Sequence, residues 1–191
     1  MCWVVVGGEA TGVEVKTWSS YCLRKGDIVD DDFENIGLWE RVETEIRAAW
    51  KGSLIPATLG NHQGDLECAD VYQWIGGRDF RDVGSDLGGL ESMIPLLCLK
   101  GEAAAYYVGS YLLHLNEIIR SDSGGPLLSH FSIIHLLSFL ESEVGAGIYR
   151  RCLNDPQKDC VLKVLAELRC RDVGGEIERL FPKSMSIGLR L

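Results

Sequence analysis

The sequence has few prolines, no long hydrophobic run and a deficit of basic residues, and each of these excludes a class of protein. With 5 prolines among 191 residues and 46% apolar residues, the chain is neither collagen-like nor disordered. Its longest apolar stretches, such as Met93–Leu99, reach about a third of the ~20 residues that span a bilayer, so we expect no membrane partner. Lys and Arg number 19 against 28 Asp and Glu, and a net charge of −9 repels phosphate backbones, so nucleic acid is not an expected partner.

The cysteine spacing and the N-terminal residues indicate in which cellular compartment the protein is found. The cysteines number seven, an odd count, and no two are spaced as C-x-x-C. The first apolar run, Trp3–Val6, is too short for the core of a signal peptide. We therefore expect a cytoplasmic protein with reduced thiols.

Apolar periodicity predicts a mainly α fold of the α+β class, a bundle of about five to six helices with a small N-terminal β-hairpin. The hairpin is expected from strands at 3–6 and 13–17. Residues 77–91 are rich in Gly and Asp and are expected to form a loop, with a short strand at 79–83. The predicted helices are 33–50, capped by Asp32; 66–75; 102–119; 127–141, buried and central; 155–171, capped by Asp155; and 176–181.

We expect one domain over 1–191. It divides into a hairpin region at 1–26, an acidic, Trp-rich helical part at 27–91 and a helical core at 92–191.

One short motif invites a catalytic interpretation. Ser121–Pro126 (SDSGGP) resembles the nucleophile loop of trypsin-like serine proteases, with Ser123 in the place of the nucleophile. That chemistry needs a histidine and a carboxylate held by two β-barrels, whereas this segment lies between two predicted helices. An interhelical turn is the favoured interpretation, and we expect no catalytic residue there.

No cofactor or metal is predicted. His62, followed by Glu67, Cys68 and Asp70, has the residue types of a metal site but lacks the paired spacing of zinc ligands. Histidines 114, 130 and 135 lie in apolar helices and are expected to be core or boundary residues, and Cys160 is the one thiol for which reactivity is worth testing.

The acidic residues cluster in two segments. Residues 27–45 hold eight acids against one arginine, and 65–91 hold seven acids against two, whereas 150–190 is basic overall. All five tryptophans lie within the first 74 residues, and aromatic anchors beside carboxylates suit a basic protein partner. The predicted partner-binding residues are Asp30, Asp31, Asp32, Glu34, Glu40 and Glu43, with Asp79 and Asp82 as a second patch.

Three segments resemble a family of small bacterial helical proteins: Glu67–Trp74 (ECADVYQW), Gly77–Val83 (GRDFRDV), and Glu102–Tyr107 (EAAAYY) followed by Tyr111-Leu-Leu. The resemblance covers roughly residues 60–170. The chain has Phe80 where that family has Trp, and Gly109 where it has Pro. The resemblance implies a mostly helical fold and no particular activity.

These observations together predict a non-enzymatic function. By type, a small, acidic protein without catalytic motifs is similar to the immunity proteins of secreted bacterial toxins. We expect a monomer or small homo-oligomer that binds a cognate basic toxin domain and occludes its active site. A small hydrolase with an Asp/His site assembled by the fold, and an oligomeric adaptor module, are the alternatives.

Overall fold

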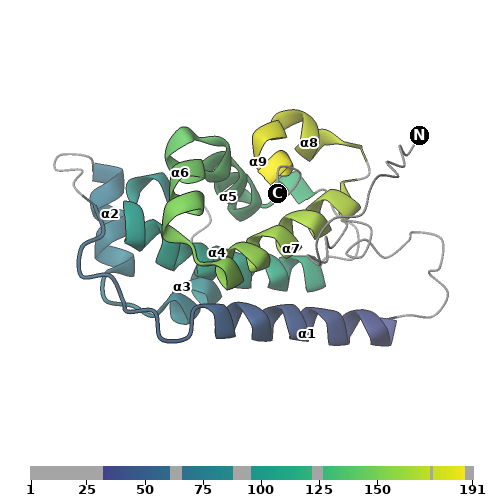
Figure 1. Ribbon diagram of the computed structural model, residues 1–191, viewed down its shortest axis with the longest axis horizontal. Helices are drawn as coiled ribbons and strands as arrows, with labels where there is room; N and C mark the ends of the chain where they lie inside the picture. Colours follow the sequence, from purple (N-terminus) through teal and green to yellow (C-terminus); the bar gives the residue numbers. More distant parts are fainter. Residues whose placement is uncertain (1–31, 61–65, 88–95, 122–126, 173, 188–191) are drawn as a thin grey trace, which may run out of the picture.

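The computed structural model describes residues 32–60, 66–87, 96–121, 127–172 and 174–187, and these residues form a bundle of α-helices (Figure 1). No β-strand occurs among them, and the predicted hairpin at 3–6 and 13–17 lies outside the described residues. The helices are α1 (Asp32–Ala49), α2 (Leu66–Ile75), α3 (Phe80–Asp86), α4 (Gly101–Ser121), α5 (Phe131–Glu141), α6 (Glu143–Cys152), α7 (Asp155–Arg171), α8 (Glu176–Leu180) and α9 (Pro182–Ser186), with 3-10 turns η3 (Leu96–Cys98) and η4 (Leu127–Ser129).

α4 is the central helix and packs against α1, α3, α5, α6 and α7. Its residues from Ala103 to Ile119 are buried, with Glu117 the exception. Small residues at 103–105, 109 and 110 let neighbouring backbones approach, and the larger Tyr and Leu side chains fill the space between helices. The helix predicted at 127–141 is confirmed over 131–141, where α5 buries Ile133, Leu136 and Leu137, but 127–129 form the turn η4 and α4, not α5, is the central helix.

α1 confirms the helix predicted at 33–50. It lies along the lower edge of the bundle in Figure 1 and turns Val42, Ile46 and Trp50 towards the core. The indole Nε1 of Trp50 donates a hydrogen bond to the carbonyl of Ala105 on α4 (3.1 Å), which fixes the end of α1 on the central helix. The chain then turns at Gly52, whose φ of +85° is a conformation that glycine adopts without strain.

α3 corrects two predictions: a helix over 80–86 stands where a short strand at 79–83 and a loop were expected, while 88–91 of the predicted loop lie outside the described residues. Asp79 caps this helix by accepting a hydrogen bond from the Arg81 N–H, and Phe80 and Val83 are buried. Ser110 Oγ on α4 donates to the Phe80 carbonyl (2.7 Å), and Gly84 leaves room for the Ser110 backbone. Tertiary packing on α4 therefore selects helix for a segment whose Gly and Asp content favours a loop.

The C-terminal half contains two further helices that periodicity did not predict, α6 and α9. α5 and α6 are separated by an 82° bend, where Ser142 Oγ accepts a hydrogen bond from the Gly145 N–H and starts α6. α9 follows directly on α8. At the start of α9, the Glu141 carboxylate accepts hydrogen bonds from the N–H groups of Lys183 and Ser184. At α7 the cap is Asn154, in a capping box with Gln157, and not the predicted Asp155.

Within the described ranges, no single helix is long and apolar enough to cross a membrane. α5 and α6 together have that length and composition, but an 82° bend separates them.

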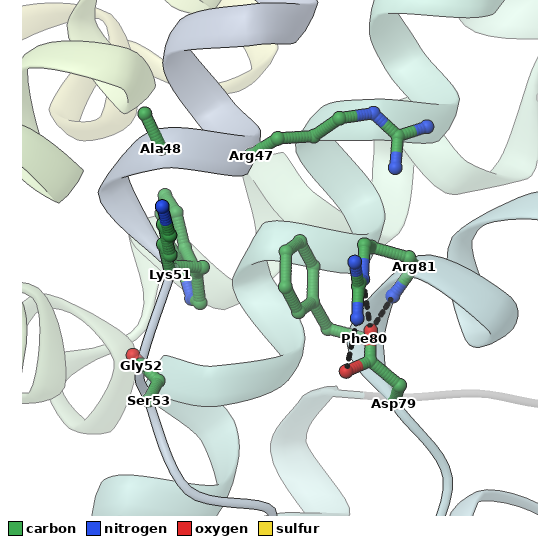
Figure 2. Close-up of a pocket in the computed structure, with 9 residues that line it drawn as sticks. Arg47, Ala48, Lys51, Gly52, Ser53, Asp79, Phe80 and Arg81 are labelled. Atoms are coloured by element: carbon green, nitrogen blue, oxygen red, sulfur yellow. Dashed lines mark hydrogen bonds and ion pairs between the residues drawn. The ribbon is translucent and has the colours of Figure 1, made fainter.

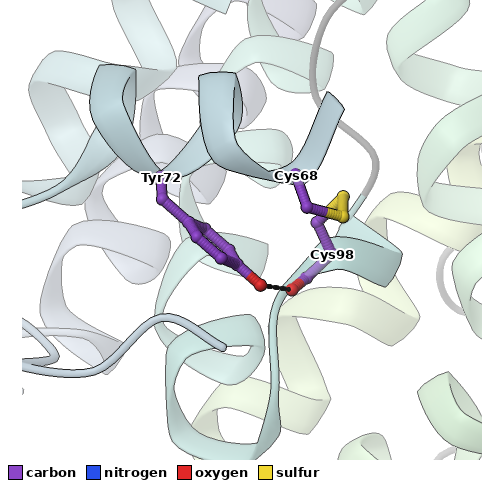
Figure 3. Close-up of a disulfide and its surroundings, with 3 residues drawn as sticks. All are labelled: Cys68, Tyr72 and Cys98. Atoms are coloured by element: carbon purple, nitrogen blue, oxygen red, sulfur yellow. Dashed lines mark hydrogen bonds between the residues drawn. A yellow bond between two sulfur atoms is a disulfide. The ribbon is translucent and has the colours of Figure 1, made fainter. Parts of the chain in front are cut away.

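A disulfide bond joins α2 to η3 through Cys68 and Cys98 (Figure 3), whose Cα atoms lie 5.2 Å apart. Beside it, the Tyr72 hydroxyl donates to the carbonyl of Cys98 (2.6 Å). Cys170 is also disulfide-bonded, whereas Cys152 and Cys160 are free. The expectation of reduced thiols is therefore wrong for three of the cysteines that the structure describes, because pairing depends on proximity in space and not on spacing in the sequence.

Candidate functional surface between α1 and α3

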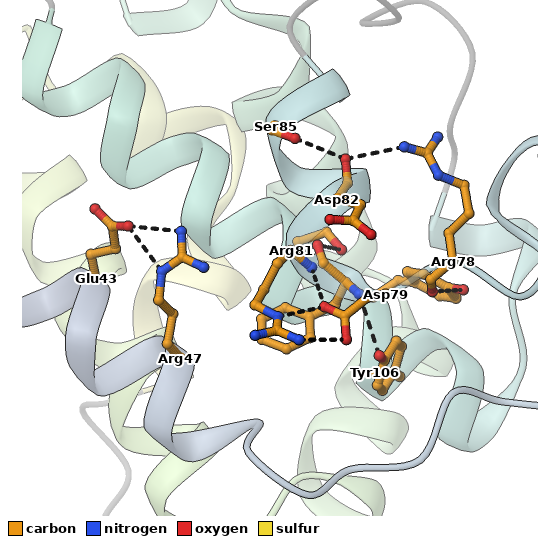
Figure 4. A network of polar contacts seen from close by, with 11 residues as sticks. Glu43, Arg47, Arg78, Asp79, Arg81, Asp82, Ser85 and Tyr106 are labelled. Atoms are coloured by element: carbon orange, nitrogen blue, oxygen red, sulfur yellow. Dashed lines mark hydrogen bonds and ion pairs between the residues drawn. The ribbon is translucent and has the colours of Figure 1, made fainter.

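The structure brings part of the two acidic segments together where the end of α1 lies near the start of α3. Figure 4 shows Glu43 of α1 on the same side of the molecule as Asp79 and Asp82 of α3. Glu40 is exposed one helical turn before Glu43. Of the other predicted partner-binding residues, Asp30 and Asp31 lie outside the described residues, and Asp32 and Glu34 lie in the first turn of α1 with no described side chain.

Arginines of the same chain pair with two of these carboxylates. Arg47 donates from Nε and Nη2 to one oxygen of Glu43, at 2.9 and 2.8 Å, along the exposed side of α1. On α3, Arg81 donates from Nε to Asp79 Oδ1 (2.7 Å) and from Nη2 to Asp79 Oδ2 (3.1 Å). The Arg81 guanidinium thereby holds the pKa of the Asp79 carboxyl below its ordinary value of 3.8, and Asp79 in turn raises the pKa of Arg81.

Arg78 joins this surface from the turn between α2 and α3. Its guanidinium donates to the Asp86 carboxylate (2.5 Å) and to the Asp82 carbonyl (3.2 Å). It also lies 4.9 Å from the centre of the Trp74 ring, a cation–π distance. Trp74 is thus the aromatic residue that accompanies the second acidic segment on this side.

We call this region the α1–α3 surface: Glu40, Glu43, Arg47, Lys51, Arg78, Asp79, Arg81, Asp82 and Asp86. It carries five carboxylates and four cations, so the described part of the surface is of mixed charge. The strong acidic excess of residues 27–45 belongs to its first eight positions, which hold Asp27, Asp30, Asp31, Asp32 and Glu34. A count along the sequence could not separate these two parts, because it does not show which arginines pair with which acids.

A hollow of about 330 Å³ opens within the α1–α3 surface, between the end of α1 and the start of α3 (Figure 2). Arg47, Lys51 and Arg81 contribute cations to its lining, and Asp79 is the one carboxylate. In Figure 2 the Phe80 ring lies between Lys51 on one side and the Arg81–Asp79 pair on the other. These three cations were not predicted from the sequence. The spacing of Glu43 and Arg47, four residues apart on one helix, could have predicted the ion pair of Arg47.

The other candidate sites gain no support as reactive centres. Ser121 ends α4 and donates its hydroxyl to the Ile118 carbonyl, while 122–126, including Ser123, lie outside the described residues, as does His62. His114 lies in α4, His130 precedes α5 and His135 lies within it. Among the described side chains, no group of three His, Cys, Asp or Glu residues could hold a metal ion.

The Cys160 thiol is buried, and burial raises its pKa to about 11, so it is a poor nucleophile at neutral pH.

Comparison of the chain with family models, with curated proteins and with solved structures gives no match.

Proposed function

We propose that the protein is a non-catalytic binding protein of the immunity type, which docks its α1–α3 surface on a cognate toxin domain and occludes that domain's active site. The observation that carries the proposal is the pre-arrangement of charged side chains on this surface. Arg47, Arg78 and Arg81 are each held by a carboxylate of the same chain, so their rotamers are restricted before any partner arrives. Binding then costs less side-chain entropy than it would for free arginines and acids.

The same surface offers groups for complementary contacts. Glu40 and Asp82 are exposed and neither carboxylate forms a salt bridge with a cation of the described residues, although Arg81 lies near enough to Asp82 for an electrostatic attraction. A partner with basic side chains opposite these two acids would gain attraction without breaking an existing ion pair. The five acids at 27–34 extend the negative charge along the chain before and into α1. We therefore expect a basic partner whose association is accelerated by charge and slowed by salt.

A capture experiment tests this proposal. The chain is used as bait in cells of the organism that encodes it, and the captured protein is then produced with and without the chain. We expect the captured protein to be toxic alone and harmless with the chain. A captured protein that is harmless by itself would contradict the immunity function.

Charge reversal then tests the surface. Glu40→Lys with Asp82→Lys should weaken binding roughly tenfold or more and reduce its dependence on salt. Glu143→Lys is the control, because Glu143 is exposed in the first turn of α6, makes no ion pair among the described residues, and α6 lies away from α1 in Figure 1. Unchanged affinity in the double variant would remove the α1–α3 surface from the interface while leaving the immunity function open to other contacts.

The disulfides bear on where this binding takes place. The cytoplasmic location predicted from the sequence depended on reduced thiols, and disulfides persist mainly in oxidising compartments. We therefore propose that the chain folds in such a compartment. Alkylation of free thiols in freshly opened cells, followed by mass measurement, tests this: Cys68 and Cys98 should escape labelling until a reductant is added.

A further inference from the structure

The hollow between α1 and α3 has a cationic rim in a chain whose net charge is −9. Three of its lining side chains are cations and one is a carboxylate, and Glu43, which pairs with Arg47, reduces the local excess to one positive charge. Lys51 makes no ion pair with any carboxylate of the described residues. A guanidinium has five N–H donors, and the ion pairs of Arg47 and Arg81 each occupy two of them.

The pairing carboxylates also orient the two guanidinium groups. Glu43 holds Arg47 from the α1 side, and Asp79 holds Arg81 through both carboxylate oxygens. Each arginine therefore keeps unused N–H donors on a side chain that is already fixed in place. The N–H donors that remain can take part in the recognition of a planar anion.

Two aromatic side chains lie at the floor of the hollow. Phe80 and Trp50 contribute to the lining, with ring centres 6.3 Å apart, and both side chains are almost wholly buried. The Trp50 indole is anchored by its hydrogen bond to Ala105, and the Arg81 guanidinium lies 6.0 Å from the centre of the Phe80 ring. A ligand that enters would meet the cations at the rim and the small exposed part of the two aromatic rings.

We propose that this hollow binds an organic carboxylate, a singly charged planar anion attached to a small apolar body. A volume of about 330 Å³ is at the lower end of small-ligand sites, so the body is no larger than one ring or one side chain. A single negative charge fits better than a phosphate dianion, because Glu43 and Asp79 lie beside the cations. The same chemistry is offered by a free small acid and by the C-terminal carboxylate of a polypeptide. The inference does not depend on the proposed function, because it concerns a ligand of this hollow alone.

The test is a titration followed by amide chemical shifts in solution, with benzoate as the free-acid probe and N-acetyl-phenylalanine as the chain-end probe. Saturable shifts at residues 47–53 and 79–81 with either probe support the proposal, and the tighter of the two identifies the source. Lys51→Glu should weaken binding roughly tenfold. Lys100→Glu is the matched control, because Lys100 is an exposed lysine outside this hollow and also makes no ion pair among the described residues.

Three results would overturn the inference. The first is the absence of saturable shifts at these residues with both probes. The second is equal binding of benzamide, the neutral counterpart of benzoate, since the charge would then play no part. The third is tighter binding of inorganic phosphate than of either carboxylate. None of these results bears on whether the chain captures a toxin, so failure here is distinguishable from failure of the proposed function.

Discussion

Trp50 and Gly109 fit against each other without room for one more carbon atom. A Cβ placed on Gly109 would lie 2.9 Å from Cδ2 and Cε2 of the Trp50 indole, closer than such atoms approach in proteins. The contact joins the end of α1 to the middle of α4, and the hollow opens directly beside it. The positions of the side chains that line the hollow therefore depend on the close contact between Trp50 and Gly109 in the core.

Gly109→Ala should destabilise the protein by about 1–3 kcal/mol, because the indole must shift and its hydrogen bond to Ala105 is strained. For a chain of this size that corresponds to a fall in Tm of about 2–4 °C for each kcal/mol. Thermal unfolding measures it. Gly174→Ala is the control, since a Cβ there meets nothing within 4 Å. Equal Tm values for the two variants would contradict the packing described here.

Replacing both disulfide cysteines, Cys68→Ala with Cys98→Ala, should lower the free energy of unfolding by about 3.5 kcal/mol, since the bond closes a loop with a sequence separation of 30 residues. Urea denaturation of the variant and the oxidised wild type gives the difference. Cys152→Ala should leave stability unchanged, because that thiol is free and exposed. A variant as stable as the wild type would mean that the bond adds nothing to the packing of α2.

Tyr107 should make the protein sensitive to alkaline pH. Its hydroxyl donates to the carbonyls of Ile75 and Arg78, and burial raises its pKa from 10.0 to about 12. A folded pKa above the unfolded one stabilises the protein below pH 10, and this contribution is lost as the pH rises towards 12. Urea denaturation across this range measures it. Tyr107→Phe should show a shallower loss, and an identical profile would exclude Tyr107 as a cause.

Asp172→Ala should loosen α8. The Asp172 carboxylate accepts the backbone N–H groups of Glu176, Ile177 and Glu178 at 3.0, 2.8 and 3.3 Å, which caps the start of this short helix. Loss of such a cap costs about 0.5–2 kcal/mol. Amide hydrogen exchange should accelerate at 176–178 and stay unchanged in α4. Unaltered exchange at 176–178 would show that the burial of Ile177 alone holds the helix.

Helices with a clear apolar period were predictable from the sequence. Those at 33–50, 66–75 and 155–171 have near counterparts in α1, α2 and α7, because each buries one face and has recognisable ends. α3 was not predictable, because its backbone groups at Phe80 are satisfied by Tyr106 and Ser110 of α4, some 26 to 30 residues away. α6 was missed because its buried positions include Gly145 and Gly147, which carry no hydrophobic signal.

The candidate surface was predictable only in part. The sequence placed Glu43 in one acidic segment and Asp79 and Asp82 in a second patch, and it did not predict that these three carboxylates lie near one another, as they do in Figure 4. Their arginine partners were not foreseen, because the pairing of Asp79 with Arg81 depends on the start of α3 and that helix was not predicted. The lysine of the Glu45–Lys163 ion pair lies 118 residues further along the chain, beyond any local pattern.

The Cys68–Cys98 bond also closes a covalent ring that contains the whole of α3. The exposed turn at Gly76 and Gly77 lies inside that ring. A protease that cuts this turn would leave both pieces attached to each other, so the nicked chain would migrate as one band on a gel run without reductant and as two bands with it. The helix that carries Asp79 and Arg81 would stay tethered at its η3 end, and partner binding by the nicked chain would report how far the surface depends on an unbroken backbone.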